Sequence, residues 1–225
     1  KASKAWSSYQ KTSASNKMKS KLLIALSKGR LLQQELDLLE RIKIMPRKDP
    51  IKSRKLVFET NRADISILVL RGSDVLTYVR HGTADIGMVG KDILIEQKGD
   101  GFYEPLDLGI GKCRLMVAGP ENESAYAGRL KIATKFTNTA KRYYALKGQQ
   151  VEIIKLFGAM ELAPLMGLAH RIVDIVETGE TLRANGLVPI EEIIKISTKL
   201  IVNESSYKTK FHDIKNLINE IGSSL

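Results

Sequence analysis

The chain has 225 residues, of which 43% are hydrophobic and 27% charged, and its formal net charge at pH 7 is +11. These values are typical of a globular protein with room for one large or two small domains. They exclude a disulfide-stabilised scaffold, because Cys113 is the only cysteine, and a helical membrane protein, because no apolar run approaches the ~18 residues of a span. A reducing cytoplasm is the expected location.

Part of the positive charge lies in a tail, residues 1–20, which is rich in Ser, Lys and Ala and has no apolar periodicity. We predict that this tail is disordered or foreign to the native chain, with Met18 as the native start. A basic tail can bind nucleic acid, but no aromatic and basic recognition module follows it. A solvated tail is the preferred interpretation, and no nucleic-acid partner is predicted.

Short apolar runs alternate with amphipathic helical patterns along the rest of the chain, which predicts an α/β architecture. Strands are predicted at residues 21–26, 55–59, 65–70, 84–89, 130–133, 151–156, 172–176 and 192–202. Helices are predicted at 31–42, 73–80, 92–97, 138–147, 159–168 and 207–221. We expect a crossing into a second lobe near 106–118 and a return near Pro189. The predicted lobe I is therefore 21–108 plus 190–225, and lobe II is 109–189.

Several predicted turns of lobe I carry cations and glycine. Lys28, Gly29 and Arg30 join the first predicted strand to the first helix. Cations and backbone N–H groups at the end of a strand suit a polyphosphate, although an ordinary helix-entry turn has the same composition. Asp74 and Asp92 follow the next two turns, where a plain helix N-cap is the alternative role.

The strand predicted at 172–176 leads into the most informative turn of the chain. Asp174 lies on this strand, Glu177 follows it, and the turn Thr178-Gly179-Glu180-Thr181 precedes a helix expected to begin near Thr181 or Leu182. Backbone N–H groups and hydroxyls at such a turn can hold a phosphate, while the acids can accept hydrogen bonds from sugar hydroxyls. The turn predicts a phosphorylated-ribose ligand.

The same region resembles the ATP phosphoribosyltransferase family, which performs the first step of histidine biosynthesis. That family carries Glu, five residues, Gly, a hydrophobic-Asp-hydrophobic strand and [Ser/Thr]-Gly-x-Thr-Leu, matched here by Glu161, Gly167, residues 173–175 and 178–182. The family's first motif, Leu-Ser-Lys-Gly-Arg, is matched at 26–30, and the resemblance covers about residues 20–210. This chain departs from the family where Leu76 replaces Pro, Ala159 replaces Ser and Glu177 replaces Asp.

The resemblance implies a two-lobed, periplasmic-binding-protein-like (type II) fold with the ligand cleft between the lobes. It implies that residues of lobe II bind 5-phosphoribosyl 1-pyrophosphate, namely Lys135, Glu161, Asp174, Glu177, Thr178, Gly179, Glu180, Thr181 and Leu182. It implies that residues of lobe I bind ATP, namely Lys28, Gly29, Arg71, Asp74, Gly90 and Asp92. Arg30 and Arg54 are implied as catalytic residues that face the departing pyrophosphate, a task that suits guanidinium groups.

The implied reaction transfers phosphoribosyl to N1 of ATP, with Mg²⁺ carried by the substrate and no metal site built by protein side chains. The chain also resembles the short form of the family, because no room remains after the last predicted helix for a histidine-binding domain. A regulatory subunit similar to histidyl-tRNA synthetase and a homodimer within a hetero-oligomer are therefore expected. Two alternatives are a purine or pyrimidine type of nucleobase phosphoribosyltransferase and a non-catalytic small-ligand binding module of the same fold.

Overall fold

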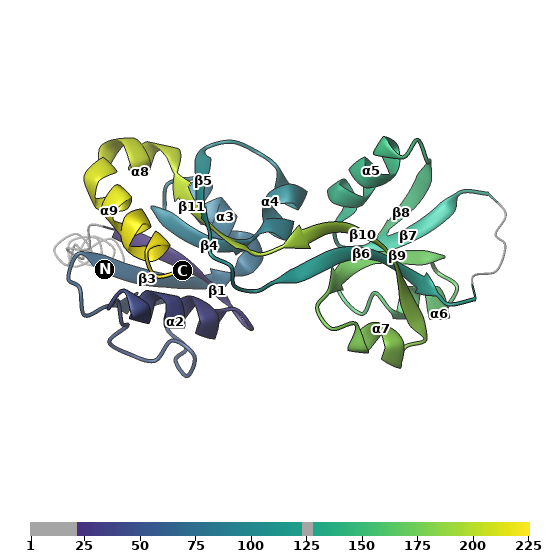
Figure 1. Ribbon diagram of the computed structural model, residues 1–225, viewed down its shortest axis with the longest axis horizontal. Coiled ribbons are helices and arrows are strands. Elements are labelled where there is room, and N and C mark those ends of the chain that lie inside the picture. Colours follow the sequence, from purple (N-terminus) through teal and green to yellow (C-terminus); the bar gives the residue numbers. More distant parts are fainter. Residues whose placement is uncertain (1–21, 123–127) are drawn as a thin grey trace, which may run out of the picture.

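The computed structural model describes residues 22–122 and 128–225, which form two α/β lobes arranged end to end (Figure 1). The predicted tail and the proposed start at Met18 lie outside the described residues. Lobe I contains the following elements before the chain leaves it: β1 (Leu22–Lys28), α2 (Leu32–Arg41), β2 (Val57–Glu59), β3 (Ile65–Arg71), α3 (Gly72–Arg80), β4 (Ile86–Gly90), α4 (Lys91–Gln97) and β5 (Phe102–Asp107).

Lobe II is built from the middle of the chain, and the C-terminal elements return to lobe I. Lobe II contains β6 (Cys113–Pro120), β7 (Leu130–Thr134), α5 (Thr137–Leu146), β8 (Val151–Lys155), α6 (Leu162–Leu165), β9 (Arg171–Val176), α7 (Glu180–Ala184) and β10 (Leu187–Ile196). Lobe I is completed by β11 (Thr198–Asn203), α8 (Glu204–Thr209) and α9 (Phe211–Gly222). The predicted alternation of strands and helices is confirmed.

Each lobe has its own mixed sheet. The strand order is β2-β3-β1-β4-β11-β5 in lobe I and β10-β6-β9-β7-β8 in lobe II. In lobe I, β1 pairs in parallel with β3 and β4, whereas β11 pairs antiparallel with β4 and β5. In lobe II, β7 pairs in parallel with β8 and β9, and β6 pairs antiparallel with β9 and β10. The carboxyl ends of the parallel strands therefore gather at one edge of each sheet.

Helices cover both faces of each sheet, because each sheet buries apolar side chains on both sides. In lobe I, α2 and α9 pack on one face and α3 and α4 on the other. In lobe II, α5 covers one face, while α6 and α7 cover the opposite face, on the lower side of Figure 1. The faces of α2 and α9 predicted to point inward do so, with Leu32, Leu39 and Ile214 buried.

A buried ionic cluster attaches the C-terminal helices to lobe I. Asp85 precedes β4 and accepts hydrogen bonds from the Leu23 backbone N–H at 2.9 Å, the Ser206 hydroxyl at 2.6 Å and the Lys210 ammonium at 2.8 Å. Lys210 lies between α8 and α9 and separates them. The single helix predicted at 207–221 is therefore wrong, because the chain breaks where Lys210 turns toward Asp85.

The predicted strand 192–202 is also wrong, because it is two strands in different sheets. β10 pairs with β6 through Ile196, and β11 begins at Thr198, so the chain returns to lobe I at Ser197 rather than at residue 190. Pro189 lies within β10, next to an irregularity in the register. β10 is an edge strand, where a proline is tolerated because its missing N–H removes no ladder bond.

Two further predictions about helices are corrected. The helix predicted at 159–168 is only four residues long, Leu162–Leu165, because Ala159 and Gly167 on either side have positive φ angles of 50° and 70°. The N-cap positions of α3 and α4 are occupied by Arg71 and Gly90, without a side-chain cap bond. The alternative role of Asp74 and Asp92 as N-caps is therefore excluded.

Candidate active site

A pocket of about 200 Å³ lies between the two lobes and contains most of the predicted phosphoribosyl residues. Lobe I contributes Arg30, from the turn after β1, and lobe II contributes residues before, along and after the end of β9. The lining is Arg30, Glu161, Asp174, Ile175, Val176, Glu177, Thr178, Gly179, Thr181 and Leu182. Among the predicted set, Glu180 and Lys135 lie outside this lining.

The turn between β9 and α7 has a backbone shape that only a few residues adopt easily. Gly179 is the N-cap of α7, with a φ of 78° in the left-handed region, where a side chain would be strained. α7 begins at Glu180, slightly earlier than predicted, and Arg183 donates a hydrogen bond to the Thr178 carbonyl at 3.3 Å. Leu182 is buried in the core of lobe II, so its side chain anchors the turn.

Asp174 lies at the centre of the electrostatics of the pocket. Burial raises the pKa of its carboxyl, Lys135 opposes that shift, and the nearby carboxylate of Glu161 adds to it. The Lys135 ammonium lies 3.7 Å from Asp174 Oδ1. Thr134 fixes the turn that carries Lys135, because its hydroxyl donates to the Val173 carbonyl at 2.6 Å and accepts from the Phe136 N–H at 2.9 Å.

Asp92 approaches the same group of charges from lobe I. Burial raises the pKa of its carboxyl, and among the charged groups that act on it Lys135 lowers the pKa while Asp174 raises it. The charge of Asp92 also affects Cys113, the first residue of β6. Burial and Asp92 both raise the pKa of its thiol. Cys113 is half-buried.

The ends of the lobe I strands place the predicted ATP residues along one edge. Lys28 is aligned with Arg71 in the β1–β3 register, and Gly90 is aligned with Thr198 in the β4–β11 register. Arg54 precedes β2, which pairs antiparallel with β3 from Val57↔Leu68 onward, so the chain at Arg54 approaches this same edge. Arg54 is nevertheless absent from the lining of the pocket that contains Arg30, and Asp74 is exposed on the first turn of α3.

Two sets of contacts join the lobes. Arg30 forms an ion pair with Glu177. In the second set, the Glu96 carboxylate, from α4, accepts hydrogen bonds from the first turn of α5: 3.0 Å from the Asn138 N–H, 2.9 Å from the Thr139 N–H and 2.9 Å from the Thr139 hydroxyl. Glu96 thus satisfies free N–H groups of a helix in the opposite lobe.

The sequence interpretation missed two functional candidates, Glu96 and Glu35. Glu35 is fully buried on the inner face of α2, and its carboxylate accepts a hydrogen bond from the Ser27 N–H at 2.7 Å. Its position between Leu32 and Leu39 on the predicted inward face was a usable signal, because an acid on that face requires a polar partner. Glu96 offered no such signal, since its partners are more than 40 residues away along the chain.

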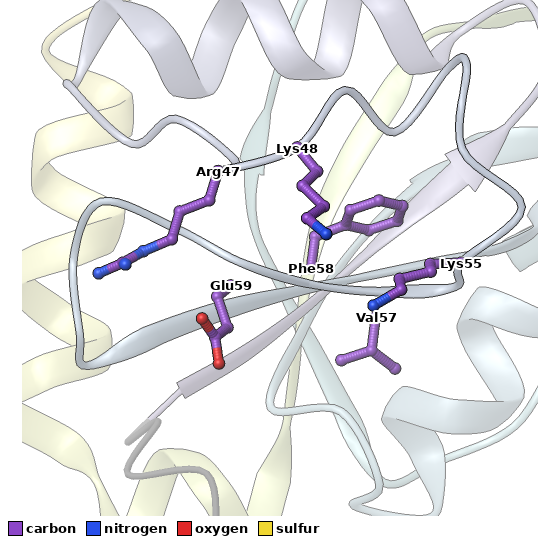
Figure 2. Close-up of a pocket in the computed structure, with 6 residues that line it drawn as sticks. All are labelled: Arg47, Lys48, Lys55, Val57, Phe58 and Glu59. Carbon is purple, nitrogen blue, oxygen red and sulfur yellow. The ribbon is translucent and has the colours of Figure 1, made fainter.

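A second concave surface, of about 340 Å³, lies along β2 at the edge of lobe I (Figure 2). Three cations, Arg47, Lys48 and Lys55, surround an apolar floor that includes buried Phe58. Figure 2 shows Lys48 extending toward Phe58 and Arg47 extending away from it. The three cations lie on exposed parts of the chain that precede β2.

The described residues build neither a metal cluster nor a helical membrane span. No group of three or more His, Cys, Asp and Glu side chains is arranged to hold a metal ion within residues 22–122 and 128–225. Over the same ranges, no helix is long and apolar enough to cross a membrane.

The two lobes, the pocket between them and the two crossings of the chain define a two-lobed ligand-binding fold of the type II periplasmic-binding-protein class. The Escherichia coli periplasmic aliphatic sulphonate binding protein SsuA has this fold, with a TM-score of 0.57 and 14% identity over 91% of this chain and 72% of that chain. This likeness confirms the predicted fold class.

Comparison with more similar proteins identifies the family. A family model described as ATP phosphoribosyltransferase matches residues 71–223. An ATP phosphoribosyltransferase of Hydrogenovibrio crunogenus is 54% identical over 92% of this chain and 100% of that protein, and one of Saccharophagus degradans is 56% identical over 92% and 97%. The structure of the ATP phosphoribosyl transferase (HisG:HisZ) complex from Thermotoga maritima gives a TM-score of 0.79 at 36% identity, over 90% of this chain and 98% of that chain. The chain belongs to the ATP phosphoribosyltransferase family, and it is a pentosyltransferase of histidine biosynthesis.

Proposed function

We propose that the pocket between the lobes binds 5-phosphoribosyl 1-pyrophosphate, with the 5-phosphate on the turn from Thr178 to Thr181 and the ribose hydroxyls on Glu161 and Asp174. The observation that carries this proposal is the pocket itself, which places Arg30 of lobe I opposite that turn. Backbone N–H groups and hydroxyls of the turn suit a phosphate, and carboxylates suit a diol. Lys135, close to Asp174, adds a positive charge next to the sugar.

ATP is proposed to bind along the strand ends of lobe I, near Lys28, Gly29, Arg71, Gly90 and Asp92. Support comes from the alignment of Lys28 with Arg71, which sets two cations side by side at one edge. The nucleophile is N1 of adenine, which needs no strong general base. The protein therefore contributes position and the neutralisation of charge on the leaving pyrophosphate, which we assign to Arg30 and Arg54.

Mg²⁺ is proposed to enter as part of the substrate, bound to pyrophosphate oxygens and water. The carboxylates of Glu161, Asp174 and Glu177 in the pocket fit this, because Mg²⁺ keeps several waters and commonly contacts one or two carboxylates. The ion neutralises phosphate charge, while the residues of the pocket hold and orient the sugar.

The chain is further proposed to act in the cytoplasm with a regulatory subunit similar to histidyl-tRNA synthetase, and to form a homodimer. The likeness to the Thermotoga maritima protein, whose structure is that of a HisG:HisZ complex, supports a second type of subunit. The exposed apolar side chains around α6 support further protein contacts. They include Phe157, Leu162, Leu165 and Met166, of which Phe157 is 86% exposed and Met166 78%.

Incubation of the chain with ATP, labelled 5-phosphoribosyl 1-pyrophosphate and Mg²⁺, followed by identification of the product, tests this proposal. The expected product carries the labelled phosphoribosyl group on N1 of the adenine, with one pyrophosphate released per product. Label on a free nucleobase supplied in competition would instead indicate a nucleobase phosphoribosyltransferase. Tight binding of the substrates without turnover, in the presence of the regulatory partner, would indicate a non-catalytic module.

A further inference from the structure

Glu35 lies in the interior of lobe I, beneath the turn that carries Lys28 and Arg30. Its Oε2 accepts a hydrogen bond from the Ser27 N–H at 2.7 Å, and the Ser27 hydroxyl donates to the Met88 carbonyl at 3.0 Å. Ser27 is therefore tied both to α2, through Glu35, and to β4, through Met88. All three residues are buried.

These bonds act where the pairing of β1 with β4 stops, while its pairing with β3 continues to Lys28↔Arg71. The β1–β4 register ends at Ala25↔Gly87, two residues before Ser27. Glu35 supplies an acceptor for a backbone N–H that lies beyond the end of this ladder. β1 ends one residue later, at Lys28, so the direction in which Gly29 and Arg30 leave the sheet depends on where Ser27 and Lys28 are held.

The surroundings of Glu35 favour its neutral form. Burial raises the pKa of the carboxyl to about 8, and the hydrogen bonds from Ser27 oppose that shift. The cations at the same edge of the sheet, Lys28, Arg30 and Arg71, are exposed, so solvent screens their charge. Glu35 Oε1 has no hydrogen-bond partner among the described residues. Ionisation would thus bury an uncompensated negative charge.

We infer that Glu35 is a positioning residue for the transfer reaction: as a neutral carboxyl it fixes the end of β1 through Ser27 and so directs the Lys28–Arg30 turn toward the substrate phosphates. This inference rests on the proposed function of that turn and adds a residue that touches no substrate. Ionisation of Glu35 would set a buried, uncompensated negative charge beneath the turn proposed to bind the substrate phosphates. The rate of transfer therefore falls as the pH rises through the titration of Glu35.

Initial rates with ATP, 5-phosphoribosyl 1-pyrophosphate and Mg²⁺, measured from about pH 6.5 to 9.5, test this with the full chain. The variants are Glu35→Gln and Glu35→Ala, with Glu40→Gln on the exposed side of α2 as the matched control. Glu35→Gln cannot ionise, so it should keep kcat within about twofold at pH 7 and lack the parental fall above pH 8. Glu35→Ala should lower kcat roughly 10- to 100-fold, with a smaller change in KM.

Identical pH profiles for the parent and Glu35→Gln overturn the inference, and so does a Glu35→Ala enzyme with the parental kcat. If Glu35→Ala does not fold, the profile of Glu35→Gln still decides. Arg30→Ala, assayed alongside, separates two failures. A parental rate for Arg30→Ala refutes the proposed function of the turn, whereas an impaired Arg30→Ala enzyme beside parental Glu35 variants refutes the inference about Glu35 alone.

Discussion

Arg30 of lobe I and Glu177 of lobe II form an ion pair across the pocket, although 147 positions separate them in the chain. Both side chains are more than half exposed, at 57% and 51%. Exposed pairs contribute about 0–1 kcal/mol to stability, so this pair is a weak tie between the lobes. An anionic substrate that enters the pocket can compete with Glu177 for Arg30 at little cost.

Arg30→Ala should therefore reduce catalysis without reducing stability. Loss of a guanidinium that neutralises the leaving pyrophosphate should lower the rate of the chemical step about 100-fold, while the melting temperature stays near that of the parent. Single-turnover kinetics and thermal melts measure both quantities. Arg129→Ala, at an exposed position before β7, is the control. A loss confined to substrate affinity would contradict the role in the transition state.

Asp174→Ala should weaken the binding of 5-phosphoribosyl 1-pyrophosphate by about 1–3 kcal/mol, because the sugar loses a charged hydrogen-bond partner. Calorimetric titration measures this, with Asp174→Asn as the matched variant that keeps the size of the side chain. The pKa of Asp174 is raised by burial, so the ionised acceptor is lost at a higher pH than for an exposed aspartate. Affinity should fall accordingly as the pH drops toward that pKa. Unchanged affinity of Asp174→Ala would exclude the assignment.

The strands and the backbone shape of the turn between β9 and α7 were predictable because their signals are local. A short apolar run, interrupted only by Asp174, marks β9 whatever its neighbours are, and the sequence around Gly179 specifies a backbone shape by itself. The split at Ser197 was not predictable in this way. One alternating pattern, which includes Ile194, Ile196 and Thr198, runs through the end of β10 and the start of β11, and only their partners, β6 and β4, show that the two strands belong to different sheets.

The contacts between the lobes also lie beyond sequence reasoning. Glu96 looked like an ordinary surface acid on a short helix, and its role became visible only when α4 and α5 were placed together. Glu35 is different, because an acid on the buried face of a predicted amphipathic helix requires a hydrogen-bond partner. The sequence could show that Glu35 needs a hydrogen-bond partner, but it could not identify Ser27 as that partner.

Glu96→Ala should loosen the contact between the two lobes. The substitution removes the acceptor for the first turn of α5, and loss of such a cap costs about 0.5–2 kcal/mol. We expect a larger radius of gyration in small-angle X-ray scattering and a higher KM for both substrates, since each lobe is proposed to hold one of them. Glu40→Ala, on the exposed side of α2, is the control. A scattering profile that matches the parent would exclude this role.

Histidine sensitivity should depend on a separate subunit. The catalytic chain alone should be active, or partly active, and unaffected by histidine, while addition of the synthetase-like partner should change its rate and confer inhibition. Such coupling requires two distinct sites linked by a conformational equilibrium. The making and breaking of the contacts that Arg30 and Glu96 form between the lobes can serve as that equilibrium. Steady-state rates with and without the partner measure it. Inhibition of the purified catalytic chain by histidine would refute regulation in trans.

Glu35→Gln should stabilise the protein in a pH-dependent way. The pKa of Glu35 is about 8 in the folded protein against an ordinary value of 4.5, so between these values the folded state holds a proton that the unfolded state has lost. Stability of the parent must then fall as the pH rises through this window, by at most about 1.4 kcal/mol per pH unit, and level off above pH 8. Glutamine has no such proton, so the difference in melting temperature between the variant and the parent should widen from pH 5 to pH 8 and then stay constant. Calorimetric scans of both proteins measure this difference, with Glu40→Gln as the control. A difference in melting temperature that is the same at every pH would show that Glu35 ionises as easily in the folded chain as in the unfolded one.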